Sequence, residues 1–126
     1  MVPVMRNVEK MTFSDIEETI ISLATKARNN KLAIEDLSGG TFSISNGGIF
    51  GSMLSAPILS GDLSAIMGMH NIVNRPVVRN GQIVSRPIMY TSVSYDHRLL
   101  DGREGAGFLK RVCDLVSDPR MLLLEL

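Results

Sequence analysis

The chain has 126 residues, of which 44% are hydrophobic and 21% are charged, and its 13 Lys and Arg residues balance 13 Asp and Glu residues. This length suits one domain with a single hydrophobic core, and the neutral charge balance disfavours a nucleic-acid-binding protein. The single cysteine, Cys113, excludes an intrachain disulfide and a cysteine-rich metal site, and no stretch reaches the ~20 apolar residues of a membrane span. Because the N-terminal residues also lack the pattern of a secretory signal, we expect a soluble intracellular protein.

The first predicted element is a helix from about Ser14 to Asn29. Its apolar residues recur on one face of a 3.6-residue period, at Ile16, Ile20, Leu23, Ala24 and Ala27. Ser14 and Glu17 have the spacing of a capping box, and Asn29-Asn30 is typical of a helix end. We expect this helix to lie on a core with its charged face in solvent.

A strand is predicted from Thr41 to Asn46. Phe42 and Ile44 point to one face, which we expect to pack, while the other face presents the hydroxyl groups of Thr41, Ser43 and Ser45. Gly47-Gly48 ends the strand, and a glycine- and serine-rich loop follows to about Asp62.

The sequence from Leu63 to Tyr95 predicts a hairpin within a larger sheet. Strands are expected at Leu63 to Ile72 and Arg75 to Arg79, followed by a two-residue turn at Asn80-Gly81, where both positions favour positive φ. The returning strands are Gln82 to Arg86 and, after an irregularity at Pro87, Ile88 to Tyr95.

A second helix is predicted from about Gly102 to Ser117, with a buried stripe of Leu109, Val112, Cys113 and Val116. The apolar C-terminal run Met121 to Leu126 indicates an interface, because chain ends are normally polar. The order of helix, strands, hairpin, strand and helix predicts an α/β fold, with a mixed sheet and helices on one face.

His97 is the main candidate for chemistry. It follows a predicted strand and precedes a helix, in the run Tyr95-Asp96-His97-Arg98-Leu99-Leu100-Asp101-Gly102. A neutral imidazole suits a general base near pH 7, and a thiol is a natural target because a base raises its thiolate fraction. A structural interpretation is also open, in which Asp101 and Glu104 cap the helix and His97 is a hydrogen-bonded turn residue.

Two segments of the chain resemble a known family. Ser94 to Glu104 resembles the active-site signature of the dihydrolipoamide acyltransferases of 2-oxo acid dehydrogenase complexes, and Thr41 to Ser52 resembles their other active-site segment. The resemblance runs nearly end to end. Gly68-Met69-His70 and Arg103-Glu104 favour the succinyl-transferring 2-oxoglutarate branch over the pyruvate branch.

The resemblance implies a chloramphenicol-acetyltransferase-like two-layer sandwich, with residues 1–126 as the C-terminal part of a catalytic domain about twice as long. It implies succinyl transfer between dihydrolipoamide and coenzyme A without a metal. His97 matches the general base, Ser45 the oxyanion donor, and Asp101 a supporting residue. It also implies trimers built into a larger cage, with lipoyl domains and other complex components as partners, in the mitochondrial matrix or the bacterial cytoplasm.

Two features depart from the family. The missing half of the domain would supply strands and channel walls, and the family's histidine and serine come from neighbouring subunits. Ser60-Gly61-Asp62-Leu63 replaces a diproline run, so this loop loses the stiffness that proline gives. These departures leave a second function open, that of a truncated, non-catalytic piece of the complex core.

Other polar residues are interpreted as structural. His70 is expected to be a strand histidine bonded to a neighbour, and Cys113 a buried, inert thiol. The arginines around the hairpin are expected to be solvated: Arg75, Arg79 and Arg86.

Overall fold

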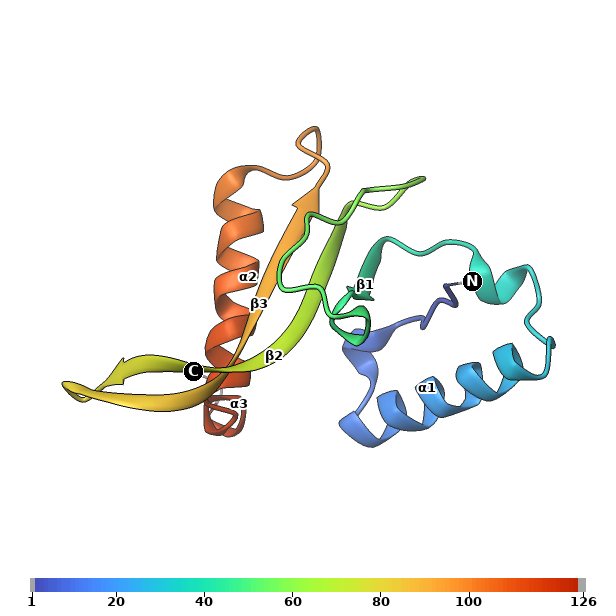
Figure 1. Cartoon of the computed structure of the whole chain (residues 1–126). Helices are drawn as coiled ribbons and strands as arrows, with labels where there is room; N and C mark the ends of the chain where they lie inside the picture. Colours follow the sequence, from blue (N-terminus) through green and yellow to red (C-terminus); the bar gives the residue numbers. More distant parts are fainter. Residues whose placement is uncertain (1, 125–126) are drawn as a thin grey trace. The chain divides into compact units, whose positions relative to one another are not determined.

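The structure, a computed structural model, describes residues 2–124 of the chain. It divides into two compact units, the first ending at Thr41 and the second beginning at Phe42. Figure 1 shows the helices and strands of both units, which are described one at a time below.

The first unit contains the short 3-10 helices η1 (Val8–Lys10) and η2 (Glu35–Leu37) and the helix α1 (Phe13–Arg28). Arg6 ties the N-terminal segment to the region after α1, because its guanidinium donates to the carbonyl groups of Glu35 and Ser38 at 2.9 and 2.7 Å.

The N-terminal cap of α1 differs from the prediction. Thr12 and Asp15 form the capping box, in place of Ser14 and Glu17: the Asp15 N–H donates to Thr12 Oγ1 at 3.2 Å, and the Thr12 N–H donates to Asp15 Oδ2 at 2.8 Å. The two sequence patterns overlap, and the cap goes to Thr12 because this residue has the extended backbone that a cap requires. The predicted end at Asn29 is confirmed.

The apolar face of α1 does not lie on a core within the described residues. None of its residues is buried, and Ile20 on the predicted face is 51% exposed. The periodicity identified side chains that share the less exposed face, since the other four are half-buried, but none of them is fully covered.

The second unit is built on a three-stranded mixed sheet of β1 (Phe42–Asn46), β2 (Ala65–Arg79) and β3 (Gln82–Tyr95), in the order β1-β2-β3. β1 and β2 are parallel, and β2 and β3 are antiparallel. The predicted mixed sheet is confirmed.

Two predicted strand breaks are wrong. β2 is continuous through the predicted gap at Val73-Asn74, because these residues pair with Ile88 and Pro87 of β3. Its irregularity lies earlier, between Met69 and Ile72, where a β-bulge bends the strand without ending it. β3 runs through Pro87, which pairs with Asn74; proline is tolerated there because β3 is an edge strand. The turn at Asn80-Gly81 is confirmed, with φ of 50° and 75°.

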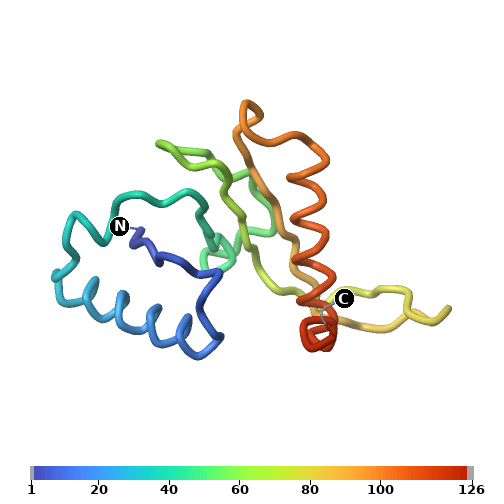
Figure 2. The backbone as a smooth tube through the Cα atoms, turned by 180° about the vertical axis from the view of Figure 1, so that it is seen from behind, coloured from blue at the N-terminus to red at the C-terminus, as the bar shows by residue number. Residues whose placement is uncertain are grey.

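The helix α2 (Gly102–Ser117) has the predicted bounds and is followed by α3 (Arg120–Leu123). Figure 2 shows α2 running beside the sheet, and the ring of its Phe108 meets that of Phe42 edge-to-face, with centroids 5.4 Å apart. Cys113 is half-buried, and its sulfur lies 3.3 Å from Thr91 Oγ1. The predicted buried stripe is only partly correct: Leu109, Val112 and Cys113 are half-buried, and Val116 is 67% exposed. Periodicity does not predict where a covering surface ends.

The buried apolar core is small. Among the described residues only Ala65 and Met67 are buried apolar side chains, whereas Ile44 is 57% exposed, against the predicted packing of its face. The described part of the apolar C-terminus is also open, with Leu123 85% exposed. Glu125 and Leu126 lie outside the described residues. Much apolar surface is therefore available to contact further protein.

Candidate active site

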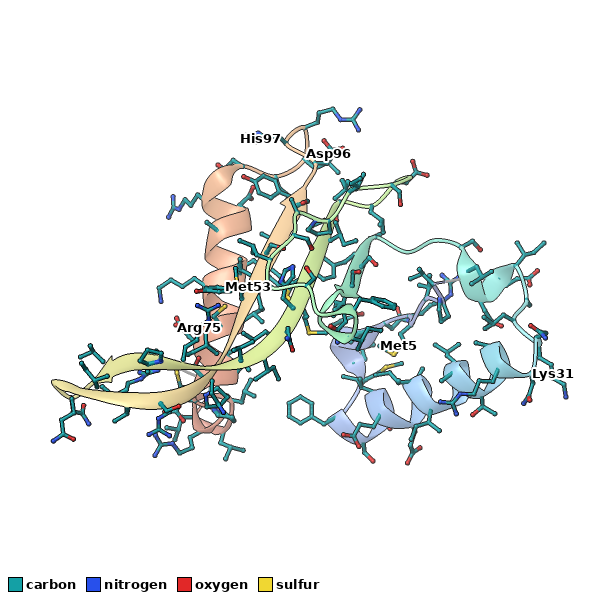
Figure 3. The ribbon with its side chains drawn as sticks, in the orientation of Figure 1. Met5, Lys31, Met53, Arg75, Asp96 and His97 are labelled. Atoms are coloured by element: carbon teal, nitrogen blue, oxygen red, sulfur yellow. The ribbon has the colours of Figure 1, made fainter. Side chains whose placement is uncertain are left out.

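His97 lies on the connection between β3 and α2 (Figure 3). Its side chain is exposed, and its ring contacts the Tyr95 ring in a tilted arrangement, with centroids 5.6 Å apart and an angle of 40° between the planes. Among the described residues no hydrogen bond is made by the imidazole. Both ring nitrogens therefore lack a hydrogen-bond partner in the described part of the chain.

Tyr95 fixes one end of this connection against α2. A Cβ atom added at Gly105 would lie 2.6 Å from Tyr95 Cε1, and one added at Gly102 would lie 3.7 Å from the Tyr95 hydroxyl. The phenol ring therefore packs against the backbone of the first turns of α2, and it also contacts the His97 ring.

This contact leads to a prediction with an internal control. Gly105→Ala is expected to destabilise the chain by about 1–3 kcal/mol, because Tyr95 must move to admit the methyl group. Gly107→Ala, in the same helix with nothing within 4 Å of the added Cβ, is expected to stabilise it by about 0.5–1 kcal/mol. Urea unfolding of both variants measures the difference. Equal effects of the two would contradict the packing.

Asp101 serves as the N-cap of α2. The Glu104 N–H donates to Asp101 Oδ1 at 3.0 Å, and the Asp101 N–H donates to Glu104 Oε2 at 2.9 Å. This capping box is the one that the sequence predicts. Within the described residues no hydrogen bond joins the Asp101 carboxylate to His97; the contact that Asp101 makes is the cap that starts α2 at the end of the His97 turn.

Ser45 is exposed on β1, and the fold does not bring it to His97. Ser45 pairs with Gly68 of β2, which pairs with Ser92 of β3, three residues before that strand ends. With about 3.3 Å per residue and about 4.8 Å between strands, Ser45 and His97 of one chain lie more than roughly 10 Å apart. Because Phe42 contacts α2, strand alternation puts Ser45 on the sheet face away from α2.

The loop after β1 is fastened to the bulged part of β2. The Gly47 N–H donates to the Met69 carbonyl at 3.0 Å, and the Asn71 N–H donates to the Ser52 carbonyl at 2.8 Å. A Cβ at Gly48 would lie 2.5 Å from the His70 carbonyl carbon, so only glycine allows this close approach.

His70 completes this attachment. It is 3% exposed, its Nε2 accepts from the N–H and hydroxyl of Ser55 at 2.8 and 2.9 Å, and its Nδ1 donates to the Tyr90 carbonyl at 2.8 Å. Since a backbone N–H can only donate, Nε2 carries no proton. The predicted role of His70 as a satisfied strand histidine is confirmed; its anchoring of a loop distant in sequence was missed, because no local pattern reveals that partner.

Arg75 was predicted to be a solvated residue, and this is wrong. Its guanidinium lies 5.6 Å from the centre of the Tyr90 ring, and one of its nitrogens lies 3.0 Å from Met53 Sδ. The cation lies over the aromatic ring of Tyr90, and its contact with Met53 adds to the attachment of the loop that His70 holds.

The turn that carries His97 also borders an open depression of about 420 Å³. It is lined by Gly61, Asp62, Leu63, Asp96, Arg98 and Leu99. The loop that departs from the family pattern therefore shares this depression with the residues on either side of His97, whereas His97 itself does not line it.

Arg98 holds the pKa of Asp96 far below its ordinary value of 3.8, at about 2, mainly through side-chain hydrogen bonds and also through its backbone N–H. Because the folded-state pKa is depressed, the stabilisation is present above about pH 4 and is lost as the pH falls towards 2. We expect the Asp96 carboxyl carbon to titrate near pH 2 by NMR. In Arg98→Ala the midpoint should rise towards 3.8 without reaching it, because the backbone N–H of residue 98 remains. A wild-type midpoint near 3.8 would show that the pair does not form.

Neither a metal site nor a membrane span is evident in residues 2–124. No group of three or more His, Cys, Asp or Glu side chains in this range could hold a metal ion. No helix there is long and apolar enough to cross a membrane.

Solved structures place this fold among acyltransferase catalytic domains. A chain from the cubic core of a pyruvate dehydrogenase multienzyme complex matches with a TM-score of 0.88 at 35% identity, and dihydrolipoamide acetyltransferase of Azotobacter vinelandii matches with a TM-score of 0.86 at 36% identity. Each match covers 98% of this chain and 51% of the other. The predicted fold, a partial acyltransferase domain, is confirmed.

The chain belongs to the 2-oxoacid dehydrogenase acyltransferase family, whose catalytic-domain model matches residues 1–124. It is 58% identical over 125 residues to the mitochondrial dihydrolipoyllysine-residue succinyltransferase component of the 2-oxoglutarate dehydrogenase complex of Bos taurus. It is 53% identical over 124 residues to the succinyltransferase component of this complex in Haemophilus influenzae. These matches cover 99% and 98% of this chain but 28% and 30% of the relatives. The chain thus spans less than a third of their length, and the predicted resemblance to the 2-oxoglutarate branch is confirmed.

Proposed function

We propose that this chain supplies the catalytic residues of a succinyl-transferring acyltransferase, acting between dihydrolipoamide and coenzyme A. One observation carries the assignment of residues. In the Azotobacter vinelandii protein, a serine, a histidine 52 positions later and an asparagine four positions after that were studied for their role in the catalytic mechanism. Ser45, His97 and Asp101 have the same spacing of 52 and four positions.

The proposed reaction uses His97 as a general base. The imidazole takes the proton of the attacking thiol, and the thiolate adds to the carbonyl carbon of the succinyl thioester. The tetrahedral intermediate then collapses, the bond to the leaving sulfur breaks, and the imidazolium returns its proton to that sulfur. The free imidazole nitrogens of His97 support this role.

Ser45 is proposed to donate its hydroxyl hydrogen to the oxyanion of the intermediate. The exposure of Ser45 leaves its hydroxyl accessible. Because Ser45 and His97 are far apart within one chain, we propose that each site takes its histidine from one subunit and its serine from a neighbour. Asp101 stands where the Azotobacter protein has an asparagine, and it acts by capping α2.

The proposed assembly is a homo-oligomer of trimers within a larger cage, with lipoyl domains and the other complex components as partners. The exposed apolar residues of the described C-terminus support an interface there, and the cubic core match supports a large assembly. The mitochondrial matrix is the proposed compartment, and the bacterial cytoplasm the alternative, because relatives come from both mitochondria and bacteria.

A second function is favoured by the small core and by the separation of Ser45 from His97. In this alternative, the chain is a non-catalytic piece of the complex core that keeps assembly surfaces without a complete site.

One experiment separates the two functions. The purified chain is given succinyl-CoA and dihydrolipoamide, with acetyl-CoA as the control for acyl selectivity, and its oligomeric state is measured by light scattering. If the chain is an enzyme, we expect acyl transfer that is faster with succinyl-CoA than with acetyl-CoA. A defined oligomer without transfer would establish the assembly function instead.

A further inference from the structure

All of the polar groups of Asp96 make hydrogen bonds, both within the connection that carries His97 and to the residue before β2. Its N–H donates to the Ser64 carbonyl at 2.9 Å, and its own carbonyl accepts from the N–H groups of Leu99 and Leu100 at 2.9 and 3.0 Å. Its carboxylate accepts from the Arg98 N–H at 2.9 Å, and from the Arg98 side chain at 3.0 Å to Nε and 2.6 Å to Nη2. One residue thus joins the start of β2 to both sides of the His97 turn.

His97 depends on this arrangement because its own side chain makes no hydrogen bond among the described residues. The Tyr95 ring supports one face of the imidazole. The rest of its placement comes from the backbone on either side, at Asp96 and Arg98. The bidentate ion pair between Asp96 and Arg98 spans His97. It therefore fixes the backbone angles of His97, and these set the direction in which its side chain points.

We propose that Asp96, paired with Arg98, is the positioning residue that aims the His97 imidazole at the reacting thiol. The kinetic consequence rests on the proposed function, whereas the ordering of the turn does not. Placement matters at this level, since an error of about 1 Å in a catalytic group can lower a rate roughly 100-fold. Asp96 itself does not touch the reacting atoms.

The chain contains a matched control pair. Asp118 and Arg120 have the same two-residue spacing and the same two-point contact, with Arg120 Nε and Nη2 at 2.7 and 2.8 Å from the Asp118 carboxylate oxygens. This pair lies at the start of α3, outside the His97 turn. Asp118→Ala therefore removes an equivalent ion pair without touching the candidate site.

The test compares Asp96→Ala with Asp118→Ala in the full chain, by amide exchange, NMR of the His97 ring and transfer kinetics. For Asp96→Ala we expect faster exchange at Leu99 and Leu100, a broadened His97 ring signal, and a kcat about 100-fold lower with KM within about twofold. Asp118→Ala is expected to leave all three unchanged. Arg98→Lys should only partly replace arginine, because an ammonium cannot make the two-point contact.

The outcomes distinguish this inference from the proposed function. If the wild-type chain transfers no succinyl group but Asp96→Ala still loosens the turn and broadens the His97 signal, the positioning stands and the enzyme function falls. The positioning is overturned if amide exchange and the His97 ring signal are the same in Asp96→Ala and Asp118→Ala. It is also overturned if Asp96→Ala loosens the turn while kcat is unchanged. Equal losses of urea stability in the two variants ensure that general unfolding is not the cause.

Discussion

His97→Ala is expected to lower succinyl transfer by a factor of roughly 10²–10⁴, the usual contribution of a general base. The fall should appear mainly in kcat, because the imidazole acts on the proton and does not hold the body of the substrate. Transfer from succinyl-CoA to dihydrolipoamide, followed by release of the coenzyme A thiol, measures it.

The substitution should leave the fold intact, since His97 is exposed and its ring contacts Tyr95 alone among the described aromatic groups. Lys31→Ala, an exposed change in the first unit, is the matched control and should keep full activity. Transfer that persists unchanged in His97→Ala would remove this histidine from the mechanism and leave the acyltransferase without its proposed base.

Mixing two inactive variants is expected to restore activity. Ser45→Ala alone should lower kcat by about 10²–10³, as loss of one oxyanion donor does. If a site takes histidine from one subunit and serine from its neighbour, random oligomers of His97→Ala and Ser45→Ala should hold both native residues in about a quarter of their sites. Activity after co-refolding of the two chains measures this recovery.

The control is the double variant that carries both changes in the same chain, mixed with wild type in the same way. In these mixed oligomers an active site needs a native His97 and a native Ser45, and only two neighbouring wild-type chains supply both. No recovery from the two single variants, in oligomers shown to exchange subunits, would mean that Ser45 and His97 do not meet across a subunit boundary. Recovery well above a quarter would point to preferred pairing of unlike chains.

Local chemistry explains the features of the fold that were predicted correctly. Asp101 and Glu104 are three residues apart, so their capping box, and with it the start of α2, follows from sequence alone. Asn80-Gly81 likewise carries its own turn, because both residues accept positive φ. The candidate site was found through Ser45 and His97, each recognised within a short run of residues.

The errors came from interactions between distant residues. The gap predicted at Val73-Asn74 is absent, since both residues pair with β3, and only the partner strand shows that pairing continues. The packing of Ile44 and Val116 was predicted from periodicity, which does not say whether another element covers a face. For the same reason Arg75 was taken as solvated, although Tyr90 lies beneath it.

The sequence by itself determined the family, the candidate base and the helix cap beside it, because these depend on residue types at short, fixed spacings. Only the tertiary structure decided that Ser45 lies away from His97, that His70 anchors the loop after β1, and that Asp96 joins the His97 turn to β2. These relations depend on strand register and on hydrogen bonds between residues up to tens of positions apart, and chain-local patterns carry no information about such partners.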